Sequence, residues 1–175
     1  DLLTPNGDVR VHAGVMARAL ELDVTAGRYG RALHRADALI HLSRRREMPE
    51  RLPEAHALHA VALWHLGQEA ATRDALRQCI IFARALGDAA SSSRIRSSRL
   101  LCALGEFDEA EQLLPSTEQI PHTRIDDPGG QAAAVRARIQ ANRGKPEGAD
   151  LAAWAMTRPL PYLRFRGAET LLDCA

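Results

Sequence analysis

Leu104-Gly105-Glu106-Phe107-Asp108-Glu109-Ala110 is one of four segments of this chain that align on a glycine. The other three contain Gly27, Gly67 and Gly144, so the glycines follow one another at intervals of 40, 38 and 39 residues. A near-constant interval of this size is typical of a repeated supersecondary unit. The chain holds only 12 glycines, which makes a chance alignment a poor explanation.

The residues around each glycine predict a tight turn between two helices. An Ala-rich amphipathic segment precedes each glycine, and a second begins within two residues after it. Glycine readily adopts the left-handed conformation that ends a helix. We therefore expect helices over residues 9–25 and 28–44, 52–66 and 68–86, 89–104 and 106–118, 129–143 and 146–157, and 162–173. Proline disrupts a helix interior, so Pro115 is expected to shorten the helix that begins at residue 106.

The composition favours an all-α protein. Ala, Leu and Arg are strong helix formers and are abundant, whereas aromatic residues make up only 4%, which argues against a sheet core. The net charge of +1, from 23 basic and 22 acidic residues, disfavours a nucleic-acid-binding domain. Lys145 is the single lysine among the basic residues, which indicates a GC-rich bacterial coding sequence.

Cysteine usage and hydropathy point to a cytoplasmic protein. Cys79, Cys102 and Cys174 are odd in number and widely spaced, so neither a disulfide framework nor a zinc site is predicted. No run of about 18 apolar residues occurs, and no membrane span is expected. The chain begins without Met and ends inside an apolar stretch, so we expect a fragment of a longer protein.

Two of the four turns resemble those of the tetratricopeptide repeat family. In that family an aromatic residue follows the glycine by two positions, and a small residue three positions later packs the helices together. Tyr29 and Phe107 match the aromatic position. The small position is matched by Ala32, Ala110 and Ala149. The departures are Glu69 and Thr72 in the second segment and Pro146 in the fourth.

The resemblance implies an all-α, right-handed α-solenoid of antiparallel helix pairs. The interval between the turn glycines of this chain exceeds the repeat length of the family, about 34 residues. Such longer repeats resemble the variant repeats of large bacterial transcription activators. We expect one domain over residues 1–175, with repeats at 9–48, 49–87, 88–126 and 127–160 and a terminal helix at 161–175. Stacked pairs of this kind enclose an inner groove that is lined by the first helix of each pair.

A binding surface follows from this implied groove. In the family, residues shortly before each turn glycine tend to point into the groove. The candidates at such positions are Arg18, Trp64, His65, Arg96, Arg99, Arg138 and Asn142. Guanidinium groups bind carboxylates strongly, so this surface would suit an acidic peptide or a carboxylate-bearing ligand. The alternative is that these arginines form an ordinary solvated helix face.

Other polar clusters have no specific motif. His56 and His59 are three residues apart on an expected helix, but no convincing third metal ligand accompanies them, so ordinary surface or groove histidines are favoured. The run Arg44-Arg45-Arg46 lies at an expected helix end, where its charge meets the negative end of the helix dipole; nucleic-acid contact is the alternative. No catalytic motif, metal site or cofactor is predicted.

The sequence therefore predicts a non-catalytic binding module, the sensing or interaction domain of a bacterial regulatory protein. The expected partner is a protein or peptide, with an acidic segment favoured and a small-molecule effector as an alternative. The competing hypotheses are a self-assembly scaffold that associates through the apolar face of residues 162–173, and an enzyme with a site between repeats.

Overall fold

The computed structural model describes residues 5–115 and 128–148, and these residues form helices and turns without a β-strand. The chain forms two compact units, Asp1–Ser93 and Arg94–Ala175. The predicted connection after Pro115, most of the helix predicted at 146–157 and the helix predicted at 162–173 lie outside the described residues. For the described part, the predicted all-α class is confirmed.

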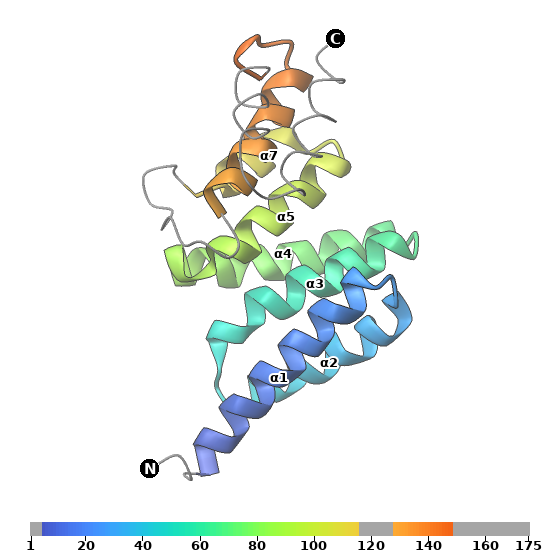
Figure 1. Ribbon diagram of the computed structural model, residues 1–175, viewed down its shortest axis with the longest axis vertical. Coiled ribbons are helices and arrows are strands. Elements are labelled where there is room, and N and C mark those ends of the chain that lie inside the picture. Colours follow the sequence, from blue (N-terminus) through green and yellow to red (C-terminus); the bar gives the residue numbers. More distant parts are fainter. Residues whose placement is uncertain (1–4, 116–127, 149–175) are drawn as a thin grey trace. The chain divides into compact units, whose positions relative to one another are not determined.

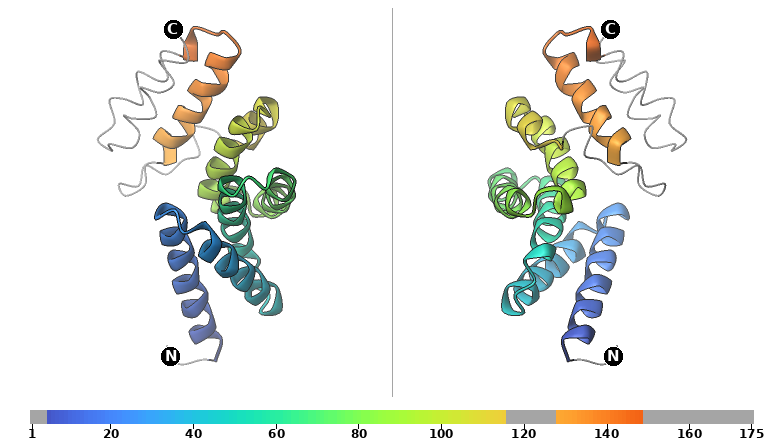
Figure 2. Two further views of the ribbon diagram at one scale, coloured as in Figure 1. Left: turned by 90° about the vertical axis from the view of Figure 1, so that its right-hand side faces the viewer. Right: turned by 90° about the vertical axis from the view of Figure 1, so that its left-hand side faces the viewer.

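The first unit contains four α-helices that pack against their neighbours (Figure 1). Their bounds are α1 Pro5–Thr25, α2 Tyr29–Arg45, α3 Leu52–His65 and α4 Glu69–Leu86. Two short 3₁₀ helices, η1 Pro49–Arg51 and η2 Gly87–Ala90, follow α2 and α4. Helices α1, α2 and α3 contact one another, and α3 also contacts α4 (Figure 2).

Helix α3 is buried on most sides because it packs against three other helices. Nine of its 14 residues are buried, including Leu58 and Leu63. Its apolar residues therefore surround the helix axis and do not form the single stripe of a surface helix. Alanines at the contacts, such as Ala13, Ala17 and Ala36, are almost completely buried and let the helix backbones approach closely.

The second unit contains α5 Ser91–Ala103, which begins at the end of the first unit, then α6 Phe107–Leu113 and α7 Pro128–Asn142. Helix α6 has only seven residues and ends before Pro115, as predicted. Leu114 is extended, the conformation favoured before proline. Arg94 donates from Nε to the carbonyl oxygen of Leu113 (2.7 Å), so a guanidinium satisfies a carbonyl that the shortened helix leaves open.

The four predicted turn glycines all have the left-handed conformation, which confirms the predicted role. Their φ values are 71° at Gly27, 72° at Gly67, 80° at Gly105 and 68° at Gly144. Each turn has the same pair of Schellman hydrogen bonds. At the first turn, the N–H of Arg28 donates to the carbonyl of Asp23 (2.8 Å) and that of Gly27 to the carbonyl of Val24 (3.1 Å).

A fifth turn of this type lacks glycine. The N–H of Met48 donates to the carbonyl of Ser43 (2.8 Å) and that of Glu47 to the carbonyl of Arg44 (3.4 Å). Glu47 has φ 53° and is the non-glycine residue with a positive φ in the described chain. The end of α2 therefore uses the same backbone motif with a residue that adopts this conformation only at a cost.

The small position after each glycine is buried. Ala32, Thr72 and Ala110 are fully buried. Thr72, a departure from the family pattern, fits because its hydroxyl donates to the carbonyl of Gln68 (2.9 Å) and so has a partner. Ala149 lies outside the described residues, but Gly148 is buried at the fourth turn. A Cβ there would lie 2.7 Å from the backbone nitrogen of Ala141, so only glycine fits.

Candidate functional site

The seven predicted groove residues fall into two groups, one in each unit. Arg18 lies on α1, and Trp64 and His65 lie at the end of α3. The other four are Arg96 and Arg99 on α5 and Arg138 and Asn142 on α7. Helices α1 and α3 contact each other, so the first group lies on neighbouring helices.

Two residues of the first group, Arg18 and His65, have partners within the chain. Arg18 is exposed and pairs with Glu21 at 2.8 Å. The ring of His65 stacks on Tyr29, with centroids 4.4 Å apart and an interplanar angle of 5°. Trp64 is half-buried. Tyr29 was predicted only as the aromatic residue of its turn, and its stacking on the next repeat was missed because the sequence does not show which helices are neighbours.

The second group is more varied in exposure. Arg96 and Arg99 are half-buried, whereas Arg138 and Asn142 are exposed. The charge of Arg138 acts on Cys102, which is buried on α5. Burial raises the pKa of the Cys102 thiol to about 11 and outweighs the opposing charge of Arg138. This thiol therefore stays protonated at neutral pH.

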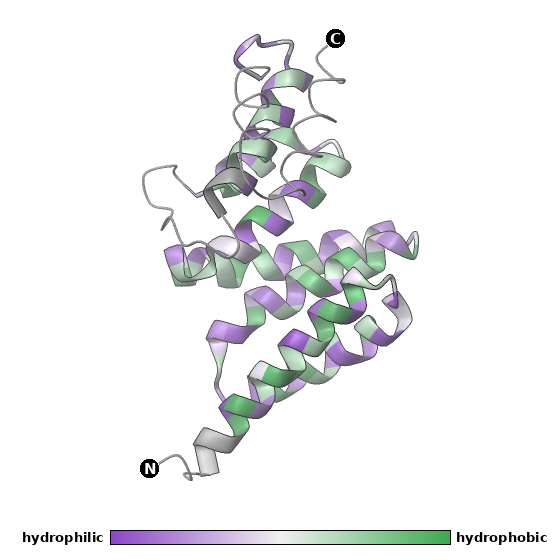
Figure 3. Cartoon of the chain, viewed as in Figure 1, coloured by the Kyte–Doolittle hydropathy of each residue, from purple (hydrophilic) through white to green (hydrophobic). Residues whose placement is uncertain are grey.

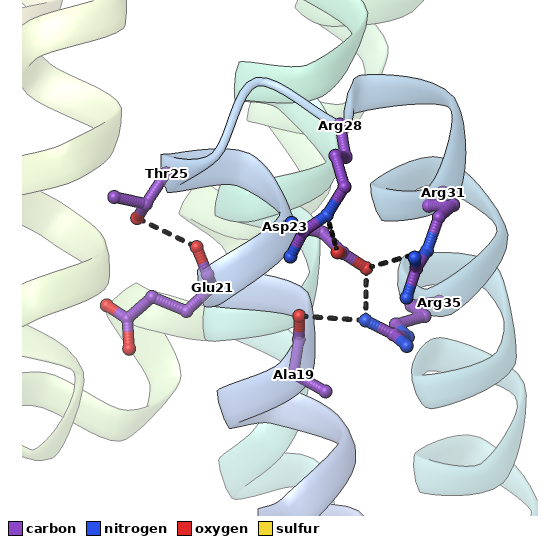
Figure 4. A network of polar contacts seen from close by, with 7 residues as sticks. All are labelled: Ala19, Glu21, Asp23, Thr25, Arg28, Arg31 and Arg35. Carbon is purple, nitrogen blue, oxygen red and sulfur yellow. Dashed lines mark hydrogen bonds and ion pairs between the residues drawn. The ribbon is translucent and has the colours of Figure 1, made fainter.

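A buried carboxylate holds the first turn together. The Asp23 side chain is fully buried, and three arginines from the turn and from α2 converge on it (Figure 4). Arg28 donates from Nε at 2.6 Å, Arg35 donates to the other oxygen, and Arg31 lies at 3.6 Å. Arg35 also donates to the carbonyl of Ala19 at 3.1 Å, which links α2 to α1.

Electrostatics keep Asp23 ionised. Burial raises the pKa of its carboxyl, but the hydrogen bond from Arg28 and the charges of Arg31 and Arg35 outweigh burial, so the pKa is lowered from its ordinary value of 3.8. All strong contacts of this cluster are internal, so we assign it a structural role. The sequence offered a signal, since an acidic residue stands four positions before the glycine where the second and third turns have leucine.

An open depression lies on α2. It is lined by Asp37, Ile40, His41, Arg44 and Arg45, which share one face because they are spaced by three or four residues. Within the described chain, neither Arg44 nor Arg45 forms an ion pair. Several other arginines of this unit do, as shown by Arg73 with Glu69 and Arg77 with Asp74.

Two histidines of α3 lie close to this depression. His59 Nε2 is 3.6 Å from the carboxylate of Asp37. Burial lowers the pKa of His59, and the charge of Asp37 opposes that shift. His56 is 5% exposed, and neither ring nitrogen has a hydrogen-bond partner. Burial, with smaller contributions from Arg44 and His59, lowers the pKa of His56 to about 4, so the ring is neutral at pH 7.

The His56 ring is held by packing. It stacks on Phe82 of α4, with centroids 5.8 Å apart and an interplanar angle of 7°. No group of three or more His, Cys, Asp or Glu side chains within residues 5–115 and 128–148 is arranged to hold a metal ion. Helix α3 therefore supplies two largely neutral imidazoles behind a depression whose exposed cations belong to α2.

The described helices include none that is long and apolar enough to cross a membrane. Comparisons with protein-family models, with curated proteins and with solved structures find no match for this chain.

Proposed function

We propose that this chain is a non-catalytic helical-repeat module that binds an acidic segment of another protein. The repeated turns support a stack of helix pairs of the tetratricopeptide type, because each of the four glycines ends a helix in the same way. A rigid stack presents its side chains without a large ordering cost on binding. A cytoplasmic bacterial regulator remains the proposed setting.

The observation that carries this proposal is the pair of arginines in the depression of α2. A guanidinium that already has a carboxylate partner must break that contact to bind a ligand, whereas Arg44 and Arg45 have no such partner among the described residues. Arginine binds carboxylates through paired, charge-assisted hydrogen bonds. A carboxylate-bearing segment is therefore the ligand that best matches this surface.

The depression also suggests the pattern of the segment. Asp37 and Arg44 are seven residues apart on α2, or about 10 Å along the helix. An extended peptide covers that distance in about three residues. A segment with a basic or amide side chain at one end and an acidic pair at the other would place each group beside a complementary one.

The surface predicted from the sequence is a second location for the same function. Arg18 and Arg138 are its exposed arginines, one in each unit. An acidic peptide that binds at either of these arginines would leave the depression of α2 empty. Variants of the two surfaces distinguish these locations.

The test is a titration of a fluorescently labelled acidic peptide, followed by anisotropy at low and at physiological salt. A basic peptide of equal length is the ligand control. We compare Arg44→Ala/Arg45→Ala with Arg18→Ala/Arg138→Ala. Arg77→Ala, an exposed arginine on α4 paired with Asp74, is the matched protein control.

If the peptide binds in the depression of α2, Arg44→Ala/Arg45→Ala should lower its affinity roughly tenfold or more, and the other two variants should change it little. Binding should also weaken as salt rises, because exposed charges are screened. A loss confined to Arg18→Ala/Arg138→Ala would assign the ligand to the groove. If the acidic and basic peptides bind equally, or if neither double variant changes affinity, the proposed function is wrong.

A further inference from the structure

Helix α1 carries an exposed apolar stripe. Val11, Val15 and Leu22 expose 67%, 63% and 64% of their surface. Figure 3 shows hydrophobic residues at intervals along this helix, with hydrophilic residues between them. The opposite face of α1 packs in the core through Ala13, Ala17 and Leu20, so the stripe is additional apolar surface.

The spacing of the stripe is that of a helix–helix contact. Val11, Val15 and Leu22 stand at positions 0, 4 and 11 of a series, and Arg18 fills position 7. At about 100° per residue these four side chains lie within a sector of about 60°. Alternating steps of four and three residues form the contact seam of a two-stranded coiled coil. The long apolar stem of Arg18 can cover such a seam while its charge stays in water.

The seam is symmetric about its midpoint, between Met16 and Ala17. Val11 and Leu22 are equally far from this point, and so are Val15 and Arg18. Two antiparallel copies of α1 related by a two-fold axis through the midpoint would therefore place Val11 against Leu22 of the other copy. A surface that matches itself in this way is what a two-fold homodimer requires.

Charges beside the seam are complementary in the same arrangement. Arg10 and Glu21 lie on the same flank of the stripe, at about −100° and −80° from Val11. With the antiparallel match, Arg10 of one copy and Glu21 of the other are only about 3 Å apart along the axis. A parallel two-fold match would instead place the Arg10 flanks of the two copies on opposite sides of the seam, and Arg10 of one copy would have no Glu21 of the other copy beside it. Charge therefore favours the antiparallel pair.

We propose that this face of α1 binds a second copy of the chain, forming an antiparallel two-fold dimer. Arg18 pairs with Glu21 in its own copy at 2.8 Å, so Glu21 would lie between two guanidinium groups at the interface. The dimer face shares no residue with the depression of α2 or with the apolar segment 162–173 of the sequence. Its existence does not depend on the proposed binding of an acidic segment.

Sedimentation velocity over a concentration series tests the interface. The wild-type chain should pass from monomer to dimer as concentration rises. Val15→Glu should weaken dimerisation roughly tenfold or more, because it places a carboxylate in an apolar seam. Ile81→Glu, at an apolar position on α4 with 59% exposure, should leave dimerisation unchanged. Circular dichroism checks that both variants keep the wild-type helicity.

A charge exchange tests the orientation. Arg10→Glu and Glu21→Arg should each weaken the dimer, and the double variant should regain most of the wild-type affinity because the cross-copy pair is restored. A strict monomer at all concentrations overturns the proposal. So does a dimer that Val15→Glu does not affect, or a double charge exchange that gives no recovery.

Discussion

The first and second turns of this protein have the same backbone conformation but different buried side chains beneath it. In both, a glycine with φ near 71° is followed by the same pair of Schellman hydrogen bonds. Four residues before the glycine, the first turn has Asp23, fully buried among three arginines, whereas the second has Leu63, which is 5% exposed and packed in the core.

The difference separates what determines the turn from what stabilises it. Glycine and the local hydrogen bonds determine the backbone path, since they are common to both sites. The residue beneath the turn can be apolar or ionic, provided that an ionic residue is fully paired. Arg28, Arg31 and Arg35 remain between 35% and 61% exposed, so Asp23 is the group of this cluster that depends most on its partners.

The largest expected effects on stability come from truncating Leu63 and Asp23, the side chains buried beneath the two turns. Leu63→Ala should lower the free energy of unfolding by about 3 kcal/mol, because it leaves a cavity. Asp23→Ala should lower the melting temperature by roughly 5–10 °C, because it removes the shared partner of three arginines. Thermal and urea unfolding measure both changes.

A leucine should be able to replace the buried aspartate of the first turn, but an aspartate should not replace the buried leucine of the second. Asp23→Leu copies the second turn and should recover most of the stability lost in Asp23→Ala, because its three arginines can be solvated and leucine fills the space. Leu63→Asp has no such partners and should fail to fold stably. Equal stability of Asp23→Leu and Asp23→Ala would show that the ionic network is indispensable.

Acid should affect α3 before it affects the first turn. His56 has a folded pKa of about 4, below its ordinary value of 6.5, so its neutral form is favoured by folding. The contribution of His56 to the free energy of unfolding should be fully present above about pH 6.5 and should fall by about 3 kcal/mol as the pH drops to 4. His59 shifts in the same direction. Asp23 stays ionised in this window and should lose its contribution only below about pH 3.8.

Urea unfolding at pH 7, 5.5 and 4.5 measures this loss. His56→Leu removes the titrating group and its unpaired nitrogens, so its unfolding free energy should depend less on pH over that range. Asp23→Leu should keep the wild-type slope between pH 6.5 and 4.5. A steeper slope in His56→Leu would contradict the assignment.

Replacing the turn glycine with alanine should lower the free energy of unfolding equally at Gly27 and at Gly67. No atom lies within 4 Å of a Cβ built at Gly27 or at Gly67, so alanine meets only the backbone cost of the left-handed conformation. Gly27→Ala and Gly67→Ala should each lower the free energy of unfolding by about 1 kcal/mol. Chemical unfolding compares them, and a large difference would show that the side-chain interior influences the backbone motif.

The smallest expected effect is a gain in stability from replacing Glu47 with glycine. Glu47 holds the left-handed position at the end of α2, where the other turns have glycine. Glu47→Gly should raise the free energy of unfolding by about 0.5 kcal/mol, the difference between relieved strain and the greater freedom of glycine in the unfolded chain. Glu47→Ala keeps the strain and serves as the control. A loss in Glu47→Gly would indicate that the glutamate side chain has a stabilising role.

The turns and helices were largely predictable because their causes are local. The glycine interval located four helix ends, and Pro115 correctly shortened α6. The sequence missed the turn at Glu47, since that position carries no glycine and its conformation follows from the hydrogen bonds around it. The predicted solenoid and its handedness remain predictions, because they depend on how successive pairs stack.

The candidate sites were harder to predict because pairing depends on tertiary contacts. The groove hypothesis selected Arg18 by its position before a glycine, and the structure pairs it with Glu21. Arg44 and Arg45 were interpreted as helix-end charges, yet they line a depression with Asp37. The sequence showed where charges lie along each helix, but the pairing of Asp23 with Arg31 and Arg35 depends on the packing of α1 against α2.

The fourth turn has a consequence for how this sequence can vary among its descendants. Just after this turn, the N–H of Gly148 donates to the carbonyl of Lys145 (3.1 Å), three residues back. Pro146 lies inside that turn, and Gly148 touches the backbone of α7. Relatives that keep the fourth turn should therefore carry glycine at 148, since any side chain there would displace the backbone of α7.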